Sequence, residues 1–160
     1  MVTPKKKIPS RLKNFTTDLT EAQIFDLIRK SLAEHRARRI SFDYDESGRA
    51  CALSFQLQIH NQVFTFRLPA RLENVKRLVE EAYQTTGLSL RGKSLDDQAY
   101  RTAWANIKDW TIAQMALVDA EMVKVEEIFL PYLLTNDDTT FFEEFEQQRQ
   151  IPAPRITEIR

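Results

Sequence analysis

The hydrophobic residues of this chain recur every three or four positions over their longest patterned stretch, 98–134. This spacing places most of them on one helix face: Ala103, Trp104, Ile107, Trp110, Leu117, Val118, Met122, Val125 and Phe129. A second row widens that face: Ile112, Met115, Ala116 and Ala120. The pattern predicts one long central helix that is apolar nearly all round, and therefore buried by other elements on several sides.

Between 40 and 68 the period changes to two, which is typical of half-buried strands. Three segments carry alternating apolar residues, in chain order Ile40, Phe42 and Tyr44, then Leu53, Phe55, Leu57 and Ile59, then Phe64, Phe66 and Leu68. The turn sequences at 45–48 and 60–62 are short. Short connections predict an antiparallel three-stranded meander with one apolar face and one polar face. The polar positions are Ser41, Asp43, Ser54, Gln56, Gln58, Thr65 and Arg67.

Helix signals flank the predicted strands. Thr20 with Gln23 three positions later is a capping-box pattern, and it begins a helix predicted over 21–37. A second helix is predicted over 70–87, where Gly87 occupies the position of a helix-ending glycine.

Ser94 is a candidate N-cap for the central helix. A short acidic helix is expected over 139–148. The predicted fold class is therefore α+β: a helix, a three-stranded antiparallel meander, a helix, a long central helix packed on the sheet, and a short C-terminal helix.

The 160 residues, 42% of them hydrophobic, suffice for one buried core without disulfides or metal. We expect a flexible basic arm over 1–15, a single domain over 16–150, and an extended tail with two prolines over 151–160. The lone Cys51 excludes an intramolecular disulfide and favours a reducing compartment. No secretory signal and no membrane span is evident, so we expect a cytoplasmic protein without membrane contact.

The formal net charge of zero conceals a division along the chain. Residues 1–93 carry 17 Lys and Arg against 10 Asp and Glu, a net of +7, and residues 94–160 carry a net of −7. One interpretation is a molecule with a basic and an acidic side, each suited to a partner of opposite charge. The alternative is that the two halves neutralise each other within the fold.

Basic residues gather in the arm and at the end of the first predicted helix: Lys5, Lys6, Lys7, Arg11, Lys13, Arg36, Arg38 and Arg39. Such residues bind the phosphates of nucleic acid, or an acidic protein surface, without reading sequence. The alternative is a solubilising tail plus cations that stabilise the negative end of a helix dipole. The polar positions of the sheet include no aromatic residue, which disfavours a base-stacking platform.

One motif match concerns phosphate. Residues 87–94, GLSLRGKS, fit the pattern of a phosphate-binding loop, in which backbone amides and a lysine hold phosphates and the hydroxyl holds magnesium. The preceding residues have helical spacing, whereas this loop should follow a buried strand. A weaker hypothesis is that Arg91, Lys93 and Ser94 contact a phosphate group of a larger ligand.

Catalytic and metal-binding patterns are sparse. His35 and His60 with one cysteine do not make a structural zinc site, and no hydrolytic triad is indicated. We therefore expect no cofactor and a binding module rather than an enzyme. Gln114 lies on the apolar helix face, where a buried amide must find hydrogen-bond partners such as a tryptophan indole or a sheet carbonyl.

Two resemblances bear on function. The order helix, three strands, helix over about 20–86 is that of double-stranded RNA-binding domains, but the start of the second helix, PARLEN, lacks their run of lysines, so no binding residue is transferred. The stretch 103–133, AWANIKDWTIAQMALVDAEMVKVEEIFLPYL, is similar to small uncharacterised proteins of phages and mobile elements. This second resemblance implies a role around nucleic acid or phage takeover of the host, and it implies no catalytic residues.

Three functions follow as hypotheses. The first is a non-enzymatic module, of phage or mobile-element origin, that binds nucleic acid or an acidic protein surface. The second is a homo-oligomeric or protein-interaction domain that uses the acidic C-terminal part. The third is a phosphate-handling enzyme centred on Lys93 and Ser94.

Overall fold

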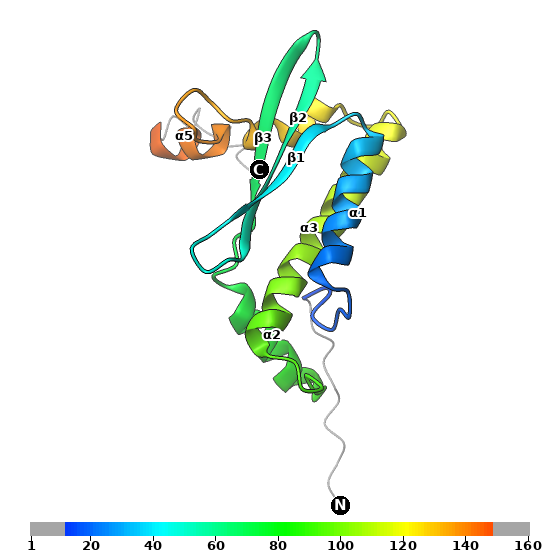
Figure 1. Ribbon diagram of the computed structural model, residues 1–160, viewed down its shortest axis with the longest axis vertical. Helices are drawn as coiled ribbons and strands as arrows, with labels where there is room; N and C mark the ends of the chain where they lie inside the picture. The colour runs from blue at the N-terminus through cyan, green and yellow to red at the C-terminus, as the bar shows by residue number, and fades with distance from the viewer. Residues whose placement is uncertain (1–11, 149–160) are drawn as a thin grey trace, which may run out of the picture.

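The computed structural model describes residues 12–148 and has the predicted α+β fold class (Figure 1). Its elements, in chain order, are α1 Glu21–Glu34, β1 Arg38–Tyr44, β2 Ala50–Ile59, β3 Gln62–Pro69, α2 Val75–Thr86, α3 Leu95–Asp119, α4 Val125–Phe129, the 3₁₀ turn η1 Leu130–Tyr132, and α5 Phe141–Gln148. Residues 1–11 and 149–160, which include most of the predicted arm and the whole predicted tail, lie outside the described residues.

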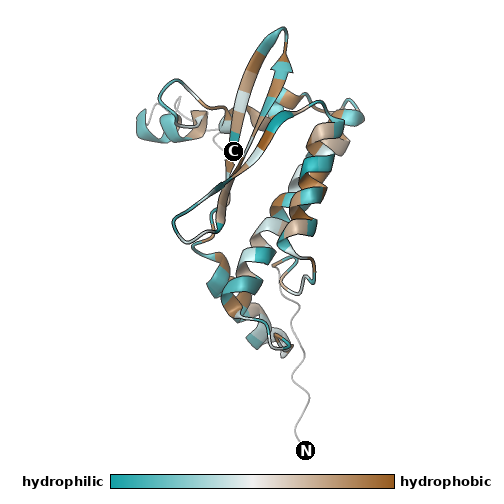
Figure 2. Ribbon diagram, in the orientation of Figure 1, coloured by the Kyte–Doolittle hydropathy of each residue, from teal (hydrophilic) through white to brown (hydrophobic). Residues whose placement is uncertain are grey.

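The three strands form one antiparallel sheet in the order β1-β2-β3, as predicted. Hydrophobic and polar residues alternate along the strands (Figure 2). The apolar positions Phe42, Leu53, Phe55, Leu57, Phe66 and Leu68 are buried. Tyr44 is an exception, because the register shifts between Asp43 and Tyr44, and its side chain is 56% exposed.

Helix α1 begins as predicted and ends earlier. Thr20 forms the complete capping box with Gln23, and the helix stops at Glu34 rather than near residue 37. The reason is local: Arg36 has a left-handed backbone with φ of 65°, which ends the α-helical path and turns the chain into β1. The arginines at 36, 38 and 39 therefore lie beyond the last helical turn, not within it.

Helix α3 packs against both α1 and α2 and carries the centre of the core (Figure 1). Trp104 is fully buried, edge-on to Phe25 and Phe42 at ring-centroid distances of 5.0 and 5.4 Å. Its indole N–H donates to the carbonyl oxygen of Ala50 at 3.2 Å. The hydroxyl of Tyr100 accepts from the N–H of the same Ala50 at 3.1 Å, so α3 is fastened to the first residue of β2 by two hydrogen bonds.

The prediction of one long central helix over 98–134 is wrong for the second half of that stretch. Helix α3 ends at Asp119, and Glu121, with φ of 55°, turns the chain into the short helix α4. The break carries Phe129 back onto the sheet, where it is fully buried at 5.1 Å from Phe55 and 5.7 Å from Phe66.

The prediction that the central helix is apolar and enclosed nearly all round is wrong as well. Met122 is 70% exposed, and Ile112 and Ala116 are also exposed. Trp110 is partly buried and packs edge-on against Phe129 and Tyr132. One side of the second half of α3 therefore faces solvent.

Helix α2 begins at Val75, later than predicted, and ends as predicted, because Gly87 adopts the left-handed conformation with φ of 68°. It packs on α3 through the buried side chains of Val79 and Ala82. Ser94 caps α3 as predicted, accepting from the N–H of Asp97 at 3.0 Å. The connection between the two helices thus starts and ends with conventional caps.

The buried amide of α3 belongs to Gln98, not to Gln114. The side chain of Gln98 is fully buried and donates to the carbonyl oxygens of Phe15 and Thr17 at 2.9 and 3.2 Å. Gln114 is half-buried, and the tryptophan indole at the core bonds to Ala50 instead. The buried amide therefore fastens residues 15–17, which precede α1, to the central helix.

Candidate functional site

The arginines predicted to bind an anionic partner lie on the connection from α1 to β1. Arg36, Arg38 and Arg39 are all exposed. Arg39 has φ of 49° and lies in an irregularity of β1, where the register with β2 shifts between Arg38 and Ser41. Two of the three arginines thus adopt left-handed backbone, which costs an L-residue about 1–2 kcal/mol and which glycine adopts freely.

Two of these residues, Arg36 and Arg38, border an open cleft of about 480 Å³. Three segments meet there: the end of α1, the β2–β3 hairpin and the start of α4, at the upper end of the molecule in Figure 1. Its apolar lining residues are Leu57, Ile59 and Val125. Its polar lining residues are His35, Arg36, Arg38, Gln58, His60 and Asn61. We call this surface the arginine cleft.

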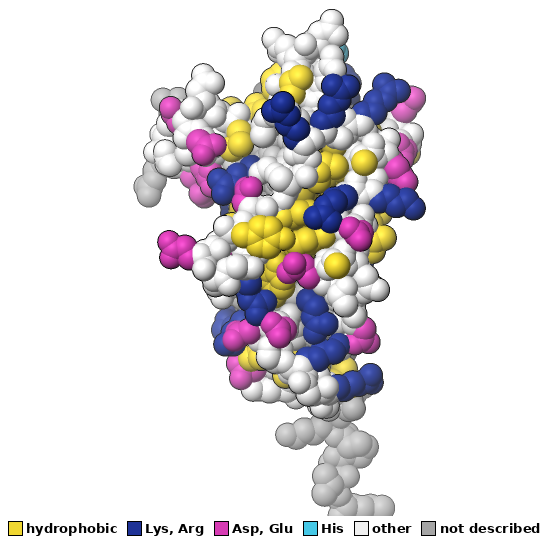
Figure 3. Space-filling model, viewed as in Figure 1, with side chains coloured by type: hydrophobic (Ala, Val, Ile, Leu, Met, Phe, Trp, Pro, Cys, Tyr) yellow, Lys and Arg dark blue, Asp and Glu magenta, His cyan; other side chains and the backbone are white. Residues whose placement is uncertain are grey.

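Seven of the thirteen other Lys and Arg side chains in residues 12–148 form an ion pair with an acidic side chain. Arg49 pairs with Asp97 at 2.6 Å and Lys76 with Asp96 at 2.8 Å, so part of the charge division between the two halves is neutralised inside the fold. No ion pair forms to Arg36, Arg38 or Arg39 within residues 12–148. Figure 3 shows Lys and Arg side chains at this end of the molecule, and acidic ones over α5 on the left.

Acidic groups also approach the arginine cleft, each beside a histidine. Asp119 lies 2.9 Å from His35, and Glu126 lies 3.6 Å from His60. The charge of the cleft is therefore mixed on the side of α3 and α4 and positive along the α1–β1 connection.

His35 joins the end of α1 to the end of α3. Its Nδ1 is 2.6 Å from the carbonyl oxygen of Ser31 and its Nε2 is 2.9 Å from a carboxylate oxygen of Asp119. Both neighbours are acceptors, so only the protonated imidazolium donates to both. Burial opposes protonation, but the hydrogen bonds to Ser31 and Asp119 outweigh it and raise the pKa of His35 above its usual 6.5.

This raised pKa makes the stability of the fold depend on pH. Because the folded state binds the proton more tightly, the contribution of His35 is fully present below about pH 6.5 and is lost as pH rises through the higher folded-state pKa. We expect the free energy of unfolding of wild type, minus that of His35→Gln, to fall over that interval by at most about 1 kcal/mol, since Asp119 is exposed. Urea unfolding of both proteins from pH 5.5 to 8.5 measures the difference, and a difference that rises with pH would contradict it.

The remaining predicted site residues are scattered. Lys5, Lys6, Lys7 and Arg11 lie outside the described residues. Lys13 is exposed, and its carbonyl oxygen accepts from the side-chain amide of Asn106 on α3 at 2.9 Å. The first described part of the predicted arm therefore already contacts the central helix.

The phosphate-loop match lies between two helices, α2 and α3, in a protein whose described sheet is antiparallel. Lys93 forms an ion pair with Asp18, and Arg91 is exposed with φ of 53°. The Lys93 ammonium lowers the pKa of Asp18, which keeps that carboxylate charged. A phosphate at Arg91, Lys93 and Ser94 would have to replace the Asp18 carboxylate.

The polar face of the sheet is satisfied internally. Asp43 accepts from the hydroxyl of Ser54 at 3.1 Å and pairs with Arg67 at 3.3 Å. Gln56 donates to the hydroxyl of Thr65 at 3.1 Å. The side chains that could contact a ligand on this face are therefore largely engaged with one another.

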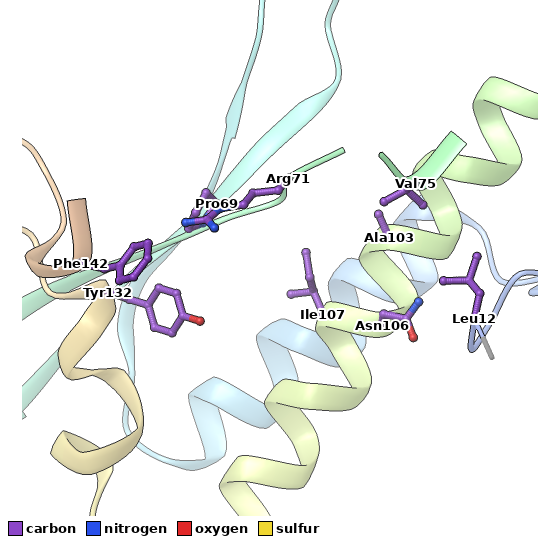
Figure 4. Close-up of a pocket in the computed structure, with 9 residues that line it drawn as sticks. All are labelled: Leu12, Pro69, Arg71, Val75, Ala103, Asn106, Ile107, Tyr132 and Phe142. Atoms are coloured by element: carbon purple, nitrogen blue, oxygen red, sulfur yellow. The ribbon is translucent and has the colours of Figure 1, made fainter. Parts of the chain in front are cut away.

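A second hollow, of about 380 Å³, separates α3 from the C-terminal elements (Figure 4). Ala103 and Ile107 line it from α3, and Tyr132 and Phe142 face them from η1 and α5. The guanidinium of Arg71 lies 5.4 Å from the centre of the Phe142 ring. This groove is mainly apolar.

Within residues 12–148, no group of three or more His, Cys, Asp or Glu side chains is arranged to hold a metal ion. The same part of the chain has no helix with the length and apolar character needed to cross a membrane. No protein-family model, no curated protein and no solved structure matches this chain.

The sequence did not predict which side chains lie beside the arginines. Sequence reasoning considered His35 and His60 only as candidate zinc ligands, and it placed Asp119 inside a continuous helix. The structure brings both histidines to the arginine cleft, although they are 25 positions apart. A signal was present for His35, because a histidine just after a helix is suited to bond the last carbonyls.

Proposed function

We propose that this protein is a non-enzymatic binding module that engages the phosphates of nucleic acid, or an acidic protein surface, through the α1–β1 arginines and the basic residues before α1. The observation that carries the proposal is that Arg36, Arg38 and Arg39 are exposed together without an acidic partner in the described part of the chain. Lys5, Lys6, Lys7, Arg11 and Lys13 would add contacts to the backbone of the same ligand.

A structural role explains these arginines poorly. Helix α1 ends at Glu34, and His35 donates to the Ser31 carbonyl, so the end of that helix has a hydrogen-bond donor of its own. Arg36 and Arg39 occupy backbone conformations that favour glycine. Strained residues cluster at functional sites, which supports a use for these two side chains outside the fold.

The mode of contact follows from the surroundings. The polar sheet face is engaged internally, so base stacking on the sheet has little support. Contacts to phosphate oxygens give affinity that is independent of sequence and sensitive to salt. Origin from a phage or mobile element is part of the same proposal, since residues 103–133 carry that resemblance.

The test compares two double variants that each remove two positive charges. Arg36→Gly with Arg39→Gly should weaken binding of a DNA or RNA duplex by about 30-fold, equal to about 1 kcal/mol for each lost contact. It should also lower the slope of log affinity against log salt by about 2. Fluorescence anisotropy over 50–200 mM salt measures both quantities.

Lys76→Gln with Arg77→Gln is the matched control, because those side chains are exposed and paired with Asp96 and Glu81. We expect it to change affinity less than threefold. Glycine also relieves the left-handed backbone at 36 and 39, so the binding variant should remain as stable as wild type to within about 1 kcal/mol. Equal losses in the two variants, or no binding to any nucleic acid at low salt, would refute contact with nucleic acid through these arginines.

A further inference from the structure

Helix α5 presents apolar side chains that the rest of the described chain covers only in part. None of its residues is buried, and Phe141 and Phe145 are 45% and 37% exposed. Four residues apart, they lie on one helix face and border a shallow hollow with Glu144 and Gln148. Of the three phenylalanines, Phe142 is the one that faces the domain, beneath Arg71.

The arginine cleft is the chemical counterpart of this face. It has an apolar lining from Leu57, Ile59 and Val125, and its edge carries Arg36 and Arg38. The two aromatic side chains beside the Glu144 carboxylate match the apolar part of the cleft and the two guanidinium groups at its edge. Interfaces are typically built with buried aromatic anchors surrounded by a complementary charged rim.

The two surfaces belong to different parts of the same molecule. In Figure 1, α5 lies on the far side of β3 from α1, whereas the cleft lies where α1 meets the sheet. No residue of α5 lines the cleft. A contact between the two surfaces would therefore join two copies.

We infer that this protein associates with itself head to tail, with α5 of one copy docked in the arginine cleft of the next. Each copy retains one free α5 and one free cleft, so the contact is heterologous and extends into a ring or a chain of copies. If the proposed function holds, nucleic acid and α5 compete for Arg36 and Arg38, so binding nucleic acid would dissociate the assembly.

The experiment measures the mass of the full chain, after nuclease treatment, by sedimentation over a wide range of concentration. Wild type should show a mass that rises with concentration above the 18.7 kDa of one copy. Phe141→Ser with Phe145→Ser should weaken association at least tenfold. The matched control, Leu78→Ser with Leu88→Ser, removes two exposed hydrophobic residues from α2 and the following loop and should leave association unchanged.

Charge reversal tests the pairing itself. Arg36→Glu with Arg38→Glu, and separately Glu144→Arg with Gln148→Arg, should each give a monomer. Mixing the two variants should restore association, because the reversed cleft of one then fits the reversed α5 of the other, and their unchanged surfaces also fit.

A wild type that stays monomeric at every concentration would overturn the inference. So would association that survives the phenylalanine variant, or failure of the mixed charge-reversed variants to associate. Nucleic-acid binding is measured separately, and the phenylalanine variant should bind nucleic acid at least as tightly as wild type. Failure of self-association therefore leaves the proposed function standing, and failure of nucleic-acid binding leaves this inference standing.

Discussion

Trp104→Ala should lower the free energy of unfolding by about 3–5 kcal/mol, the cost typical of removing a large buried aromatic side chain. Trp104 is fully buried, edge-on to the stacked rings of Phe25 and Phe42, and its indole N–H also donates to the Ala50 carbonyl. The substitution therefore leaves a cavity and a buried carbonyl without its donor. Urea unfolding followed by circular dichroism measures the loss.

Two further variants of α3 residues serve as controls for this measurement. Trp104→Phe keeps most of the ring packing and removes the hydrogen bond, so we expect a smaller loss of about 1–3 kcal/mol. Ile112→Ala changes an exposed residue of α3 and should cost no more than about 0.5 kcal/mol. If Trp104→Ala costs no more than Ile112→Ala, the tryptophan is not the centre of the core.

Gln98→Ala should lower the free energy of unfolding by about 3 kcal/mol. The substitution removes the donor to the carbonyl oxygens of Phe15 and Thr17, and the Arg101 guanidinium loses the acceptor that it contacts at 3.1 Å. Each buried group left without a partner costs about 1–3 kcal/mol. Relative to wild type, hydrogen exchange in the variant should accelerate more in residues 12–19 than in the core strands.

Gln114→Ala is the matched control, because it is the same residue type on the same helix and is half-buried. It should change stability by less than about 0.5 kcal/mol. Equal effects of the two substitutions would contradict the assignment of Gln98 as the buried amide.

The helix boundaries that depend on local chemistry were predicted well. The capping box at Thr20, the left-handed Gly87 and the Ser94 cap each depend on a few neighbouring residues, and each is confirmed. The alternation of the strands was also sufficient to predict the sheet and its buried face, because a period of two allows only one assignment of faces. Tyr44 departs from the pattern where a register shift intervenes.

The break in the central stretch could not be predicted from its periodicity. The same three-and-four spacing continues through Met122 and Phe129, and neither proline nor glycine marks the turn at Glu121. Burial of Phe129 against the second and third strands decides where the helix stops, and that contact joins residues more than sixty positions apart. Periodicity also could not show which side of the helix faces solvent, so Ile112 and Ala116 were wrongly expected to be buried.

The candidate site shows the same division. The sequence alone predicted the basic run at 36–39, the acidic character of α5 and the lack of aromatic residues on the polar strand face. These are properties of residue types at known positions. Only the tertiary structure decided that Arg36 and Arg38 border a cleft with a partly apolar lining, while Lys93 pairs with Asp18. Pairing and exposure depend on which distant segments come together, and the burial of the core, not the charges, determines that packing.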